Sequence, residues 1–240
     1  MIKRCFDFFF SLFGLILLSP VLFTFSFLIW FQDFKSPFYI SKRVGIGGKE
    51  ISFIKLRSMV VDADSSGVDS TSSNDLRITP VGSIIRKYKI DELTQLWNVL
   101  IGDMSLVGPR PNVLADVNLY TETEKNLLSV KPGITDFSSI VFSDEGKILE
   151  NKENPDLSYN QLIRPWKSRL GLIYIKHKSI LLDLELMIFT LVALISKSMA
   201  LKWVVKKLEK FNVDQKIIEV AKRDKELSPF PPPGSDKIVV

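Results

Sequence analysis

The sequence predicts an α+β fold that is mainly helical, with a small β-hairpin, an N-terminal membrane helix and amphipathic interfacial helices. Three observations support this prediction. Residues 8–31 contain no charged residue, two short runs rich in β-branched and aromatic residues flank a glycine-rich stretch at Gly45, and apolar residues recur with helical spacing from Ile90 onward. At 240 residues, one globular domain with attachments is the natural organisation.

The composition excludes several classes of site. A single cysteine, Cys5, excludes an internal disulfide and a multi-cysteine metal site, and a single histidine, His177, argues against a histidine-based zinc site or a Ser-His-Asp triad. We therefore expect His177 to serve the fold or the surface. The net charge of +5 fits an anionic membrane surface or phosphorylated substrates, whereas no motif accompanies it that would favour nucleic acid.

The N-terminal apolar run is long enough to cross a bilayer as a helix, because about 20 residues suffice. One interpretation is therefore a membrane-spanning signal anchor; a cleaved signal peptide fits less well, because the apolar core is too long. Ser19-Pro20 predicts a kink, since proline removes one helical hydrogen bond. Basic residues flank both ends of the run, so the distribution of charge does not indicate which end of the helix faces the cytoplasm. A helix–break–helix that dips into one leaflet and returns remains the alternative.

The stretch from Phe38 to Met59 predicts a hairpin. The glycines of Gly45-x-Gly47-Gly48 lack the spacing of a P-loop and are expected to form a turn. Lys55 and Arg57 are two residues apart and would point to the same face of a strand. Both cations could therefore bind one anionic group, or they could be solvated charges at a strand edge. Residues 62–75, rich in Asp, Ser and Gly, predict a loop or short frayed helix that could cover the site.

Residues 90–100 predict an amphipathic helix that ends in a left-handed cap near Gly102. Asp91 and Glu92 lie in its first turn, where free N–H groups and the helix dipole favour negative charge. Capping alone could explain them. Adjacent carboxylates, with Arg86 about one turn upstream and Arg110 in a rigid downstream loop, also fit the handling of a phosphate ester with a metal ion.

The C-terminal third is predicted to be helical and basic. Residues 180–205 predict an amphipathic helix on the core or at the lipid interface, because their longest uncharged part is too short to span a bilayer. Residues 197–225 are rich in lysine, which fits either attraction to anionic headgroups or a plain solvated helix. The proline-rich end, residues 229–240, is expected to be disordered.

A long string from Ile90 to Pro111, containing Asp91-Glu92-Leu93 and ending in Gly108-Pro109-Arg110-Pro111, resembles the signature of the bacterial sugar transferases, the monotopic phosphoglycosyl transferases. Further blocks agree with this resemblance: Lys3-Arg4-x-Phe6-Asp7 followed by Ser19-Pro20, Lys55-Leu56-Arg57-Ser58-Met59, Arg77-Ile78-Thr79-Pro80 and Lys131-Pro132-Gly133-Ile134-Thr135. The resemblance implies a re-entrant membrane helix bent at Ser19-Pro20 over residues 1–35, a cytoplasmic catalytic domain over 36–200, and a basic amphipathic helix with a disordered tail over 201–240.

The resemblance also implies a function. A UDP-sugar gives its sugar-1-phosphate to polyprenol (undecaprenyl) phosphate at the cytoplasmic face of the bacterial inner membrane, UMP leaves, and synthesis of a lipid-linked glycan begins. Asp91 is then the nucleophile and Glu92 helps to hold Mg²⁺, the expected cofactor. Lys55, Arg57 and Arg86 are candidate phosphate contacts, and Pro109, Arg110 and Pro111 form the candidate nucleotide contact. A homodimer and association with later-pathway glycosyltransferases are further expectations.

The resemblance weakens after Thr135. The arginine that the family pattern expects at Ser143 and the aspartate that it expects near Gly171 are both missing, and Arg164 or Arg169 could substitute. Two other functions stay open: a membrane-anchored scaffold with a basic tail, which leaves the Asp91–Pro111 string unexplained, and a glycosyltransferase that moves only the sugar and releases UDP. The sequence does not indicate which sugar is transferred.

Overall fold

The computed structural model describes residues 2–63, 71 and 74–239. It confirms the predicted fold class: mostly helix, with an antiparallel hairpin and a long apolar N-terminal helix. The predicted loop at 62–75 lies largely outside the described residues. In chain order the main elements are α1 (Ile2–Asp33), β1 (Phe38–Val44), β2 (Glu50–Leu56), α2 (Pro80–Lys87), η3 (Ile90–Thr94), α3 (Gln95–Ile101), β3 (Ser105–Val107), α4 (Leu114–Asn118), η4 (Glu124–Ser129), β4 (Gly133–Thr135), α5 (Phe137–Val141), α6 (Glu145–Ile148), α7 (Pro155–Ser158), η5 (Tyr159–Ile163), α8 (Arg164–His177), α9 (Ile180–Ile195), α10 (Lys197–Lys210) and α11 (Gln215–Lys222).

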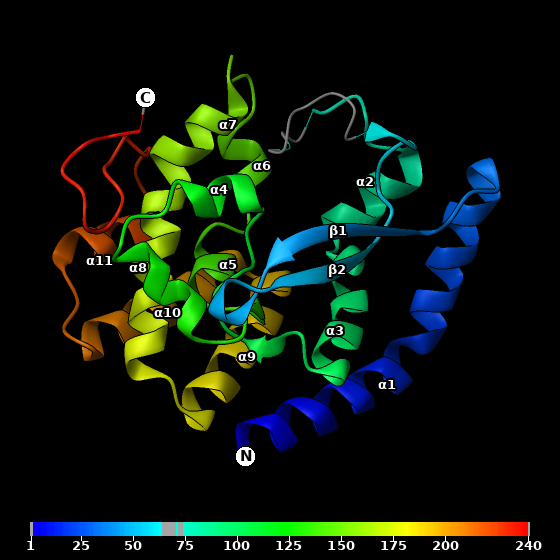
Figure 1. Ribbon diagram of the computed structural model, residues 1–240, viewed down its shortest axis with the longest axis horizontal. Coiled ribbons are helices and arrows are strands. Elements are labelled where there is room, and N and C mark those ends of the chain that lie inside the picture. The colour runs from blue at the N-terminus through cyan, green and yellow to red at the C-terminus, as the bar shows by residue number, and fades with distance from the viewer. Residues whose placement is uncertain (1, 64–70, 72–73, 240) are drawn as a thin grey trace.

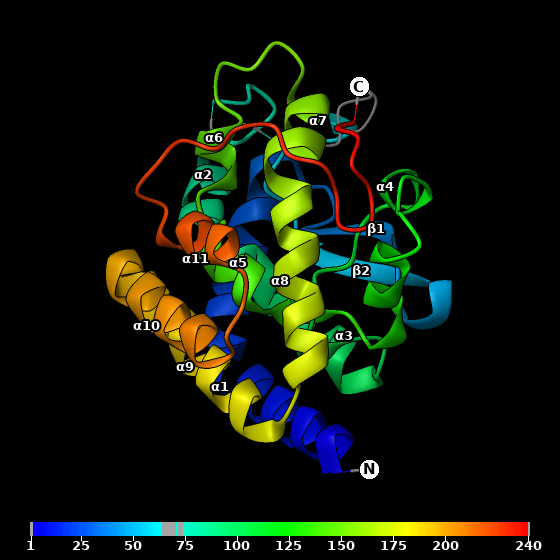
Figure 2. The same ribbon diagram turned by 90° about the vertical axis from the view of Figure 1, so that its left-hand side faces the viewer.

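The hairpin lies between two groups of helices (Figure 1). β1 and β2 pair in the register Phe38↔Leu56 to Val44↔Glu50, and the short helical turn η1 (Ile46–Gly48) connects them. On one side lie α1, α2 and α3, and on the other lie α4 to α11. Figure 2 shows α8 running upright through this second group, with α9 and α10 alongside one another. The main core is built from α3, β2 to β4, α5 and the helices from η5 to α11.

Helix α1 changes direction along its length (Figure 1), and Pro20 lies inside it. Proline has no N–H, so the carbonyl of Ile16 loses its usual i+4 donor. The hydroxyl of Ser19 donates to that carbonyl oxygen at 2.8 Å instead. The Ser-Pro pair therefore supplies both the break in the ladder and a replacement donor for the carbonyl that the break leaves open.

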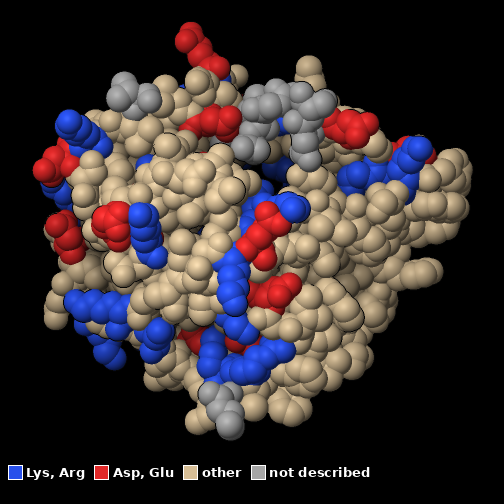
Figure 3. All heavy atoms as spheres, viewed as in Figure 1, with Lys and Arg blue, Asp and Glu red and all other residues tan. Residues whose placement is uncertain are grey.

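Both ends of α1 are fixed to the rest of the molecule. Near its start, the Arg4 guanidinium donates to the carbonyls of Val99 (2.5 Å) and Leu100 (2.6 Å) in the last turn of α3. At its end, the Asp33 carboxylate accepts two hydrogen bonds from Arg57, at 2.5 and 2.7 Å. Most of the side chains between these two anchors are exposed and apolar. Charged side chains gather instead in a strip through the middle of the face in Figure 3.

The C-terminal region differs from the sequence prediction in two ways. The helix expected over 180–205 is broken at Ser196, which caps α10, and α10 contributes Val204 and Leu208 to the core. Residues 229–239, expected to be disordered, instead pack on α8. Phe230 stacks on Trp166 with ring centroids 4.4 Å apart, and the carbonyl of Pro231 accepts from Arg169 at 2.9 Å. Proline-rich backbone forms no internal ladder, so its carbonyls remain available to side chains.

The strands β3 and β4 bring two backbones into unusually close contact. They pair in parallel through Ser105↔Gly133 and Val107↔Thr135. A Cβ added at Gly133 would lie 2.0 Å from the nitrogen of Gly108, and one at Gly108 would lie 2.6 Å from the carbonyl oxygen of Lys131. Only glycine fits at either position, because backbone atoms cannot move aside as a flexible side chain would.

We expect Gly133→Ala to destabilise the protein by about 2 kcal/mol or more, because the added methyl forces β3 and β4 apart. For a chain of this size the thermal unfolding midpoint in detergent should fall by about 4–8 °C. Gly47→Asn is the matched control: Gly47 has φ 66°, a conformation that asparagine tolerates, and its Cβ would meet no atom within 4 Å. An unchanged midpoint for Gly133→Ala would contradict the close approach.

Candidate functional site

The predicted carboxylates lie on a short 3₁₀ turn rather than in the first turn of an α-helix. η3 holds Asp91 and Glu92, and α3 follows it directly and ends at Gly102 in the left-handed conformation with φ 98°. The predicted left-handed cap is therefore confirmed. The turn begins after Lys89, whose φ of 54° is also left-handed. This reversal separates η3 from α2 and turns the carboxylates toward the hairpin.

Helix α3 is fixed to the outer edge of β2 by buried polar side chains. The Asn98 amide accepts from the N–H of Ile54 at 3.2 Å and donates to the carbonyl of Ser52 at 2.6 Å. The hydroxyl of Thr94 lies 3.0 Å from the carbonyl oxygens of Ile54 and Asp91. A buried amide that pairs with both backbone groups of a strand sets the register of the helix along it. Asp91 is thereby held beside Lys55.

The structure brings four of the predicted residues together. The Lys55 ammonium lies 3.9 Å from Asp91 Oδ2, and Arg110 Nη2 donates to Glu92 Oε1 at 2.8 Å. Asp91 is 7% exposed. Lys55 and Arg110 also lie over the ring of Phe53, at 5.4 and 5.9 Å from its centroid. Cations over an aromatic face are stabilised by the ring quadrupole, so Phe53 helps to hold both in place.

The pKa values of the two carboxyl groups are shifted in opposite directions. Burial raises the pKa of Asp91, an effect that Glu92 reinforces and Lys55 opposes. Burial alone would raise the pKa of Glu92 as well, but Arg110, Lys89 and Lys55 outweigh it and lower that pKa to about 2. Burial, together with Arg110, lowers the pKa of Lys55 to about 8. Glu92 is therefore a permanent carboxylate, and the charge of Asp91 responds to its surroundings.

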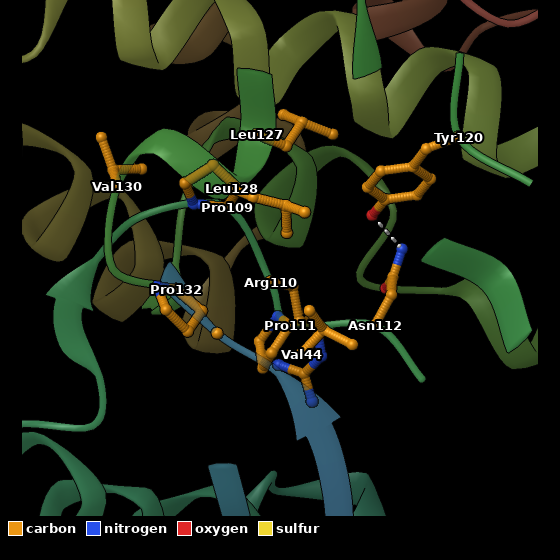
Figure 4. A pocket seen from close by; sticks show the side chains of 11 residues that line it. Val44, Pro109, Arg110, Pro111, Asn112, Tyr120, Leu127, Leu128, Val130 and Pro132 are labelled. Carbon is orange, nitrogen blue, oxygen red and sulfur yellow. Dashed lines mark hydrogen bonds between the residues drawn. The ribbon is translucent and has the colours of Figure 1, made fainter. Parts of the chain in front are cut away.

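The loop that carries Arg110 is placed by the β3–β4 contact. The N–H of Gly108 donates to the carbonyl of Thr135 at 3.0 Å, and the N–H of Gly133 donates to that of Pro109 at 2.9 Å. Pro109 and Pro111 flank Arg110 and restrict its backbone. Figure 4 shows the hollow beside this loop, where Asn112 donates to the Tyr120 hydroxyl at 2.9 Å. Its lining is Val44, Gly45, Pro109, Arg110, Pro111, Asn112, Tyr120, Leu127, Leu128, Val130 and Pro132.

Of the other two predicted phosphate contacts, Arg57 lies differently from expectation and Arg86 lies near the carboxylates. Arg57 does not share an anionic site with Lys55, because the strand ends at Leu56 and the Arg57 side chain binds Asp33 and the carbonyl of Ser36. Its role in the structure is to fasten the end of α1. Arg86 lies in the last turn of α2 and acts on Asp91 through its charge, helping to lower the pKa of that carboxyl.

Sequence analysis missed Arg43, whose guanidinium lies 5.8 Å from the Phe53 ring centroid. The observed register pairs Arg43 with Ile51, so Phe53 is its diagonal neighbour on the same face. Extending the hairpin pairing by three residues would have found it. Burial and the nearby Arg110 lower the pKa of Arg43, so the cluster holds more positive charge than the motifs indicated.

Comparison with known proteins identifies the family of the chain. The bacterial sugar transferase family matches residues 1–197. The chain is 35% identical to the uncharacterized sugar transferase EpsL of Bacillus subtilis over 79% of this chain and 85% of that protein. It is 33% identical to the UDP-glucose:undecaprenyl-phosphate glucose-1-phosphate transferase of Klebsiella pneumoniae, over 78% of this chain and 39% of that protein.

A third relative is the UDP-N-acetylgalactosamine-undecaprenyl-phosphate N-acetylgalactosaminephosphotransferase of Aeromonas hydrophila, 34% identical over 58% of this chain and 34% of that protein. The family match covers α1, the hairpin, the paired carboxylates and the Arg110 loop, and it ends where α10 begins. By its sequence, the chain belongs to the bacterial sugar transferase family.

Proposed function

We propose that the protein is a phosphoglycosyl transferase (EC 2.7.8 class), which moves sugar-1-phosphate from a UDP-sugar to polyprenol (undecaprenyl) phosphate and releases UMP. The observation that supports this most directly is the convergence of Asp91, Glu92, Lys55 and Arg110 within hydrogen-bond or ion-pair distance. The names of the Klebsiella and Aeromonas relatives describe this class of reaction with two different sugars. The proposal therefore leaves the sugar unspecified.

The two carboxylates are suited to different roles. Glu92 is tied to Arg110 and stays ionised, which suits a ligand or orienting group. Asp91 has Lys55 at 3.9 Å, beyond hydrogen-bond length, so a lone pair remains free to attack. Covalent catalysis by a carboxylate divides one difficult phosphoryl transfer into two easier ones, because the acyl phosphate formed is itself reactive.

In the first step, an Asp91 oxygen forms a bond to the sugar-linked phosphorus of the donor, and the bond from that phosphorus to the bridging oxygen of the diphosphate breaks, so that UMP leaves. In the second step, a phosphate oxygen of the polyprenol phosphate attacks the same phosphorus and the Asp91–phosphorus bond breaks. The product is a polyprenol diphosphate sugar. Lys55, Arg110 and Arg86 are the cations that would bind the phosphoryl oxygens in both steps.

Glu92, and beside it Asp91, fit a Mg²⁺ ion, which is typically bound by one or two carboxylates together with substrate phosphates and water. No larger cluster of acidic, histidine or cysteine ligands occurs among residues 2–63, 71 and 74–239. A bound Mg²⁺ would neutralise charge on the diphosphate and the leaving group. The low pKa of Glu92 keeps that ligand ionised at any physiological pH.

We infer that the protein lies in one leaflet, at the cytoplasmic face of the bacterial inner membrane. Helix α1 is apolar and long enough to cross a bilayer. Its two ends, however, bind the same folded body, through Arg4 to α3 and through Asp33 to Arg57. A spanning helix would separate its ends by the ~30 Å hydrocarbon layer. The bend at Ser19-Pro20 supports a helix that enters and returns, with its apolar side chains in lipid.

A second apolar surface supports the same orientation. On α9 and α10, several large apolar side chains are exposed along one side, and exposed apolar patches of this kind mark interaction or membrane surfaces. These residues are Leu181, Ile188, Leu191, Leu194, Ile195, Met199 and Trp203. Lys3 of α1 pairs with Asp183 of α9 at 2.7 Å, so the start of α1 lies beside the start of α9. The active site would then lie at headgroup level, where the acceptor's phosphate lies.

Asp91→Asn should reduce UMP release by about a thousandfold or more, because an amide cannot form the phosphoryl intermediate. The assay incubates detergent-solubilised protein with UDP-sugars, polyprenol phosphate and Mg²⁺. Mass spectrometry of quenched wild-type enzyme should find a phosphosugar on Asp91. Glu122→Gln, at an exposed carboxylate paired with Lys125, is the control and should turn over normally. UDP as product would indicate a glycosyltransferase, and no product with any donor would favour a scaffold.

The pH dependence of kcat/KM should show an alkaline limb near pH 8, since the Lys55 ammonium is present below its pKa of about 8 and is lost as the pH rises through it. Lys55→Arg, whose charge persists, should move this limb to higher pH. Lys55→Met should lower kcat/KM about tenfold or more at neutral pH and remove the limb. Lys49→Arg, at the exposed tip of the hairpin, should leave the profile unchanged. An identical limb in Lys55→Arg would contradict the assignment.

For the membrane topology, we expect an N-terminal tag and a cysteine introduced as Lys35→Cys, in a Cys5→Ala background, to react with impermeant reagents only in inverted vesicles. Both positions flank α1, so the same accessibility at each end is what a re-entrant helix requires. Intact spheroplasts serve as the control for the outer face. Labelling of the N-terminal tag in spheroplasts would restore a spanning helix.

A further inference from the structure

A small polar cavity lies on the other side of the Arg110 loop, between that loop and the first turn of α8. It shares Pro109, Arg110, Asn112, Tyr120 and Leu127 with the hollow in Figure 4. The remaining lining residues are Asp136, Ser138, Arg164, Lys167 and Ser168. Because Arg110 lines both cavities and also binds Glu92, this cavity adjoins the proposed catalytic carboxylates.

Arg164 is the unusual member of this lining. It is 1% exposed and is the largest of the fully buried side chains. Within the described part of the chain, none of its three guanidinium nitrogens has a hydrogen-bond partner. The nearest carboxylate oxygen is Glu124 Oε1, 4.0 Å from Nε. Glu124 already accepts from the Ser168 hydroxyl at 2.7 Å and from the N–H of Thr121 at 3.0 Å.

A buried guanidinium with unmet donors is energetically unfavourable. Removing such a group from water costs several kcal/mol unless charge-assisted hydrogen bonds replace the lost solvation. Glu124 offsets the charge from 4.0 Å but does not satisfy the donors. An oxyanion with several acceptor oxygens would do both, because the planar fork of arginine matches phosphoryl oxygens in pairs.

The other charged groups of the cavity favour an anion. Lys167 and Arg110 are both cations, although each already has a carboxylate partner, Glu145 and Glu92 respectively. Asp136 is the only acidic residue among the cavity's lining residues. Burial raises its pKa, and its Oδ1 accepts from Ser138 and Ser139. Hydrogen bonds within its own turn satisfy Oδ1, whereas Oδ2 has no partner among the described residues. Arg110, Arg164 and Lys167 outnumber this one carboxyl group in the lining.

We propose that Arg164 binds a phosphoryl group of one of the two substrates, next to the Arg110–Glu92 pair. The inference builds on the proposed function, since phosphoryl groups reach the site either as the diphosphate of the soluble donor or as the phosphate of the lipid acceptor. Both offer the same oxygens to the guanidinium. Arg164 is thus a substrate-binding residue, and its burial makes the contact strong because water does not compete.

Arg169 provides a matched comparison on the same helix. Its guanidinium is not part of the cavity lining and lies beside the stacked rings of Trp166 and Phe230, at 5.4 and 4.8 Å from their centroids. Its Nη1 donates to the carbonyls of Pro165 and Pro231, both at 2.9 Å. Its donors are therefore met within the chain itself. Removing Arg169 deletes one arginine from α8 without touching the cavity.

The test measures the affinity of the full-length protein in nanodiscs for UDP, UMP and inorganic phosphate, and for polyprenol phosphate incorporated into the nanodisc. We compare Arg164→Gln, Arg164→Lys and the control Arg169→Gln with the wild type. Arg164→Gln should lower the affinity for at least one of these ligands by about tenfold or more, as expected for the loss of a buried charge-assisted hydrogen bond. Arg164→Lys keeps a positive charge beside Glu124 but loses the planar guanidinium fork, so its affinity should lie between those of the wild type and Arg164→Gln. Arg169→Gln should bind as the wild type does.

The ligand that weakens identifies the source: loss confined to UDP and UMP assigns the donor phosphate, and loss confined to polyprenol phosphate assigns the acceptor phosphate. Wild-type affinity for all four ligands in both Arg164 variants, or an equal loss in Arg169→Gln, would overturn the inference. If the variants do not fold, the test is amide hydrogen exchange of residues 159–168 in the wild type. At least one of the four ligands should slow this exchange, and an unchanged rate with all four would refute the contact. A protein that binds these ligands through Arg164 yet releases no UMP would overturn the proposed function alone.

Discussion

The constraint on which the site depends is the fixing of the η3–α3 segment at its middle and at its C-terminal end. In the middle, Thr94 and Asn98 bind the backbone of β2, so the carboxylates cannot shift along the strand. At its end, the left-handed cap at Gly102 donates its N–H to the carbonyls of Asn98 and Val99, and Arg4 of α1 binds the carbonyls of Val99 and Leu100 in the last turn. A cation is favourable there because it opposes the negative end of the helix. The membrane helix therefore helps to position the carboxylates that lie one helix-length away.

The same constraint links helix α1 to the candidate site. Arg4 and Arg57 connect opposite ends of α1 to α3 and to the end of β2, and these two elements hold Asp91 and Lys55. Lys131, whose ammonium donates to the carbonyl of Gly102 at 2.6 Å, adds the β4 side to the same cap. β4 also carries the close backbone contact that places the Arg110 loop. The contacts of Arg4, Lys131 and β4 together therefore set the distance between the Asp91–Glu92 turn and the Arg110 loop.

Features that depend on neighbouring residues could be predicted from the sequence. The hairpin, the cap at Gly102 and the acidic turn at Asp91 follow from local patterns of glycine and apolar residues. Pairings between distant residues could not. Nothing in the spacing of Arg57 indicates that Asp33 binds it, and Arg164 and Arg169 were equivalent from sequence until their burial and partners separated them. The tail was misjudged because its composition suggests disorder, whereas the aromatic surface of α8 stabilises it.

Adjacent carboxylates repel each other, as Glu92 does Asp91, and could compete for the same cations. The 3₁₀ turn explains why these two have separate cationic partners. With three residues per turn, neighbouring side chains point about 120° apart, while positions i and i+3 align. Glu92 accordingly reaches the loop and binds Arg110, while Asp91 faces Lys55 on the hairpin. Thr94, three residues on, lies on the same side as Asp91 and binds β2. The turn thus converts one dipeptide into an ionised group fixed by Arg110 and a second carboxyl group that faces Lys55 at 3.9 Å.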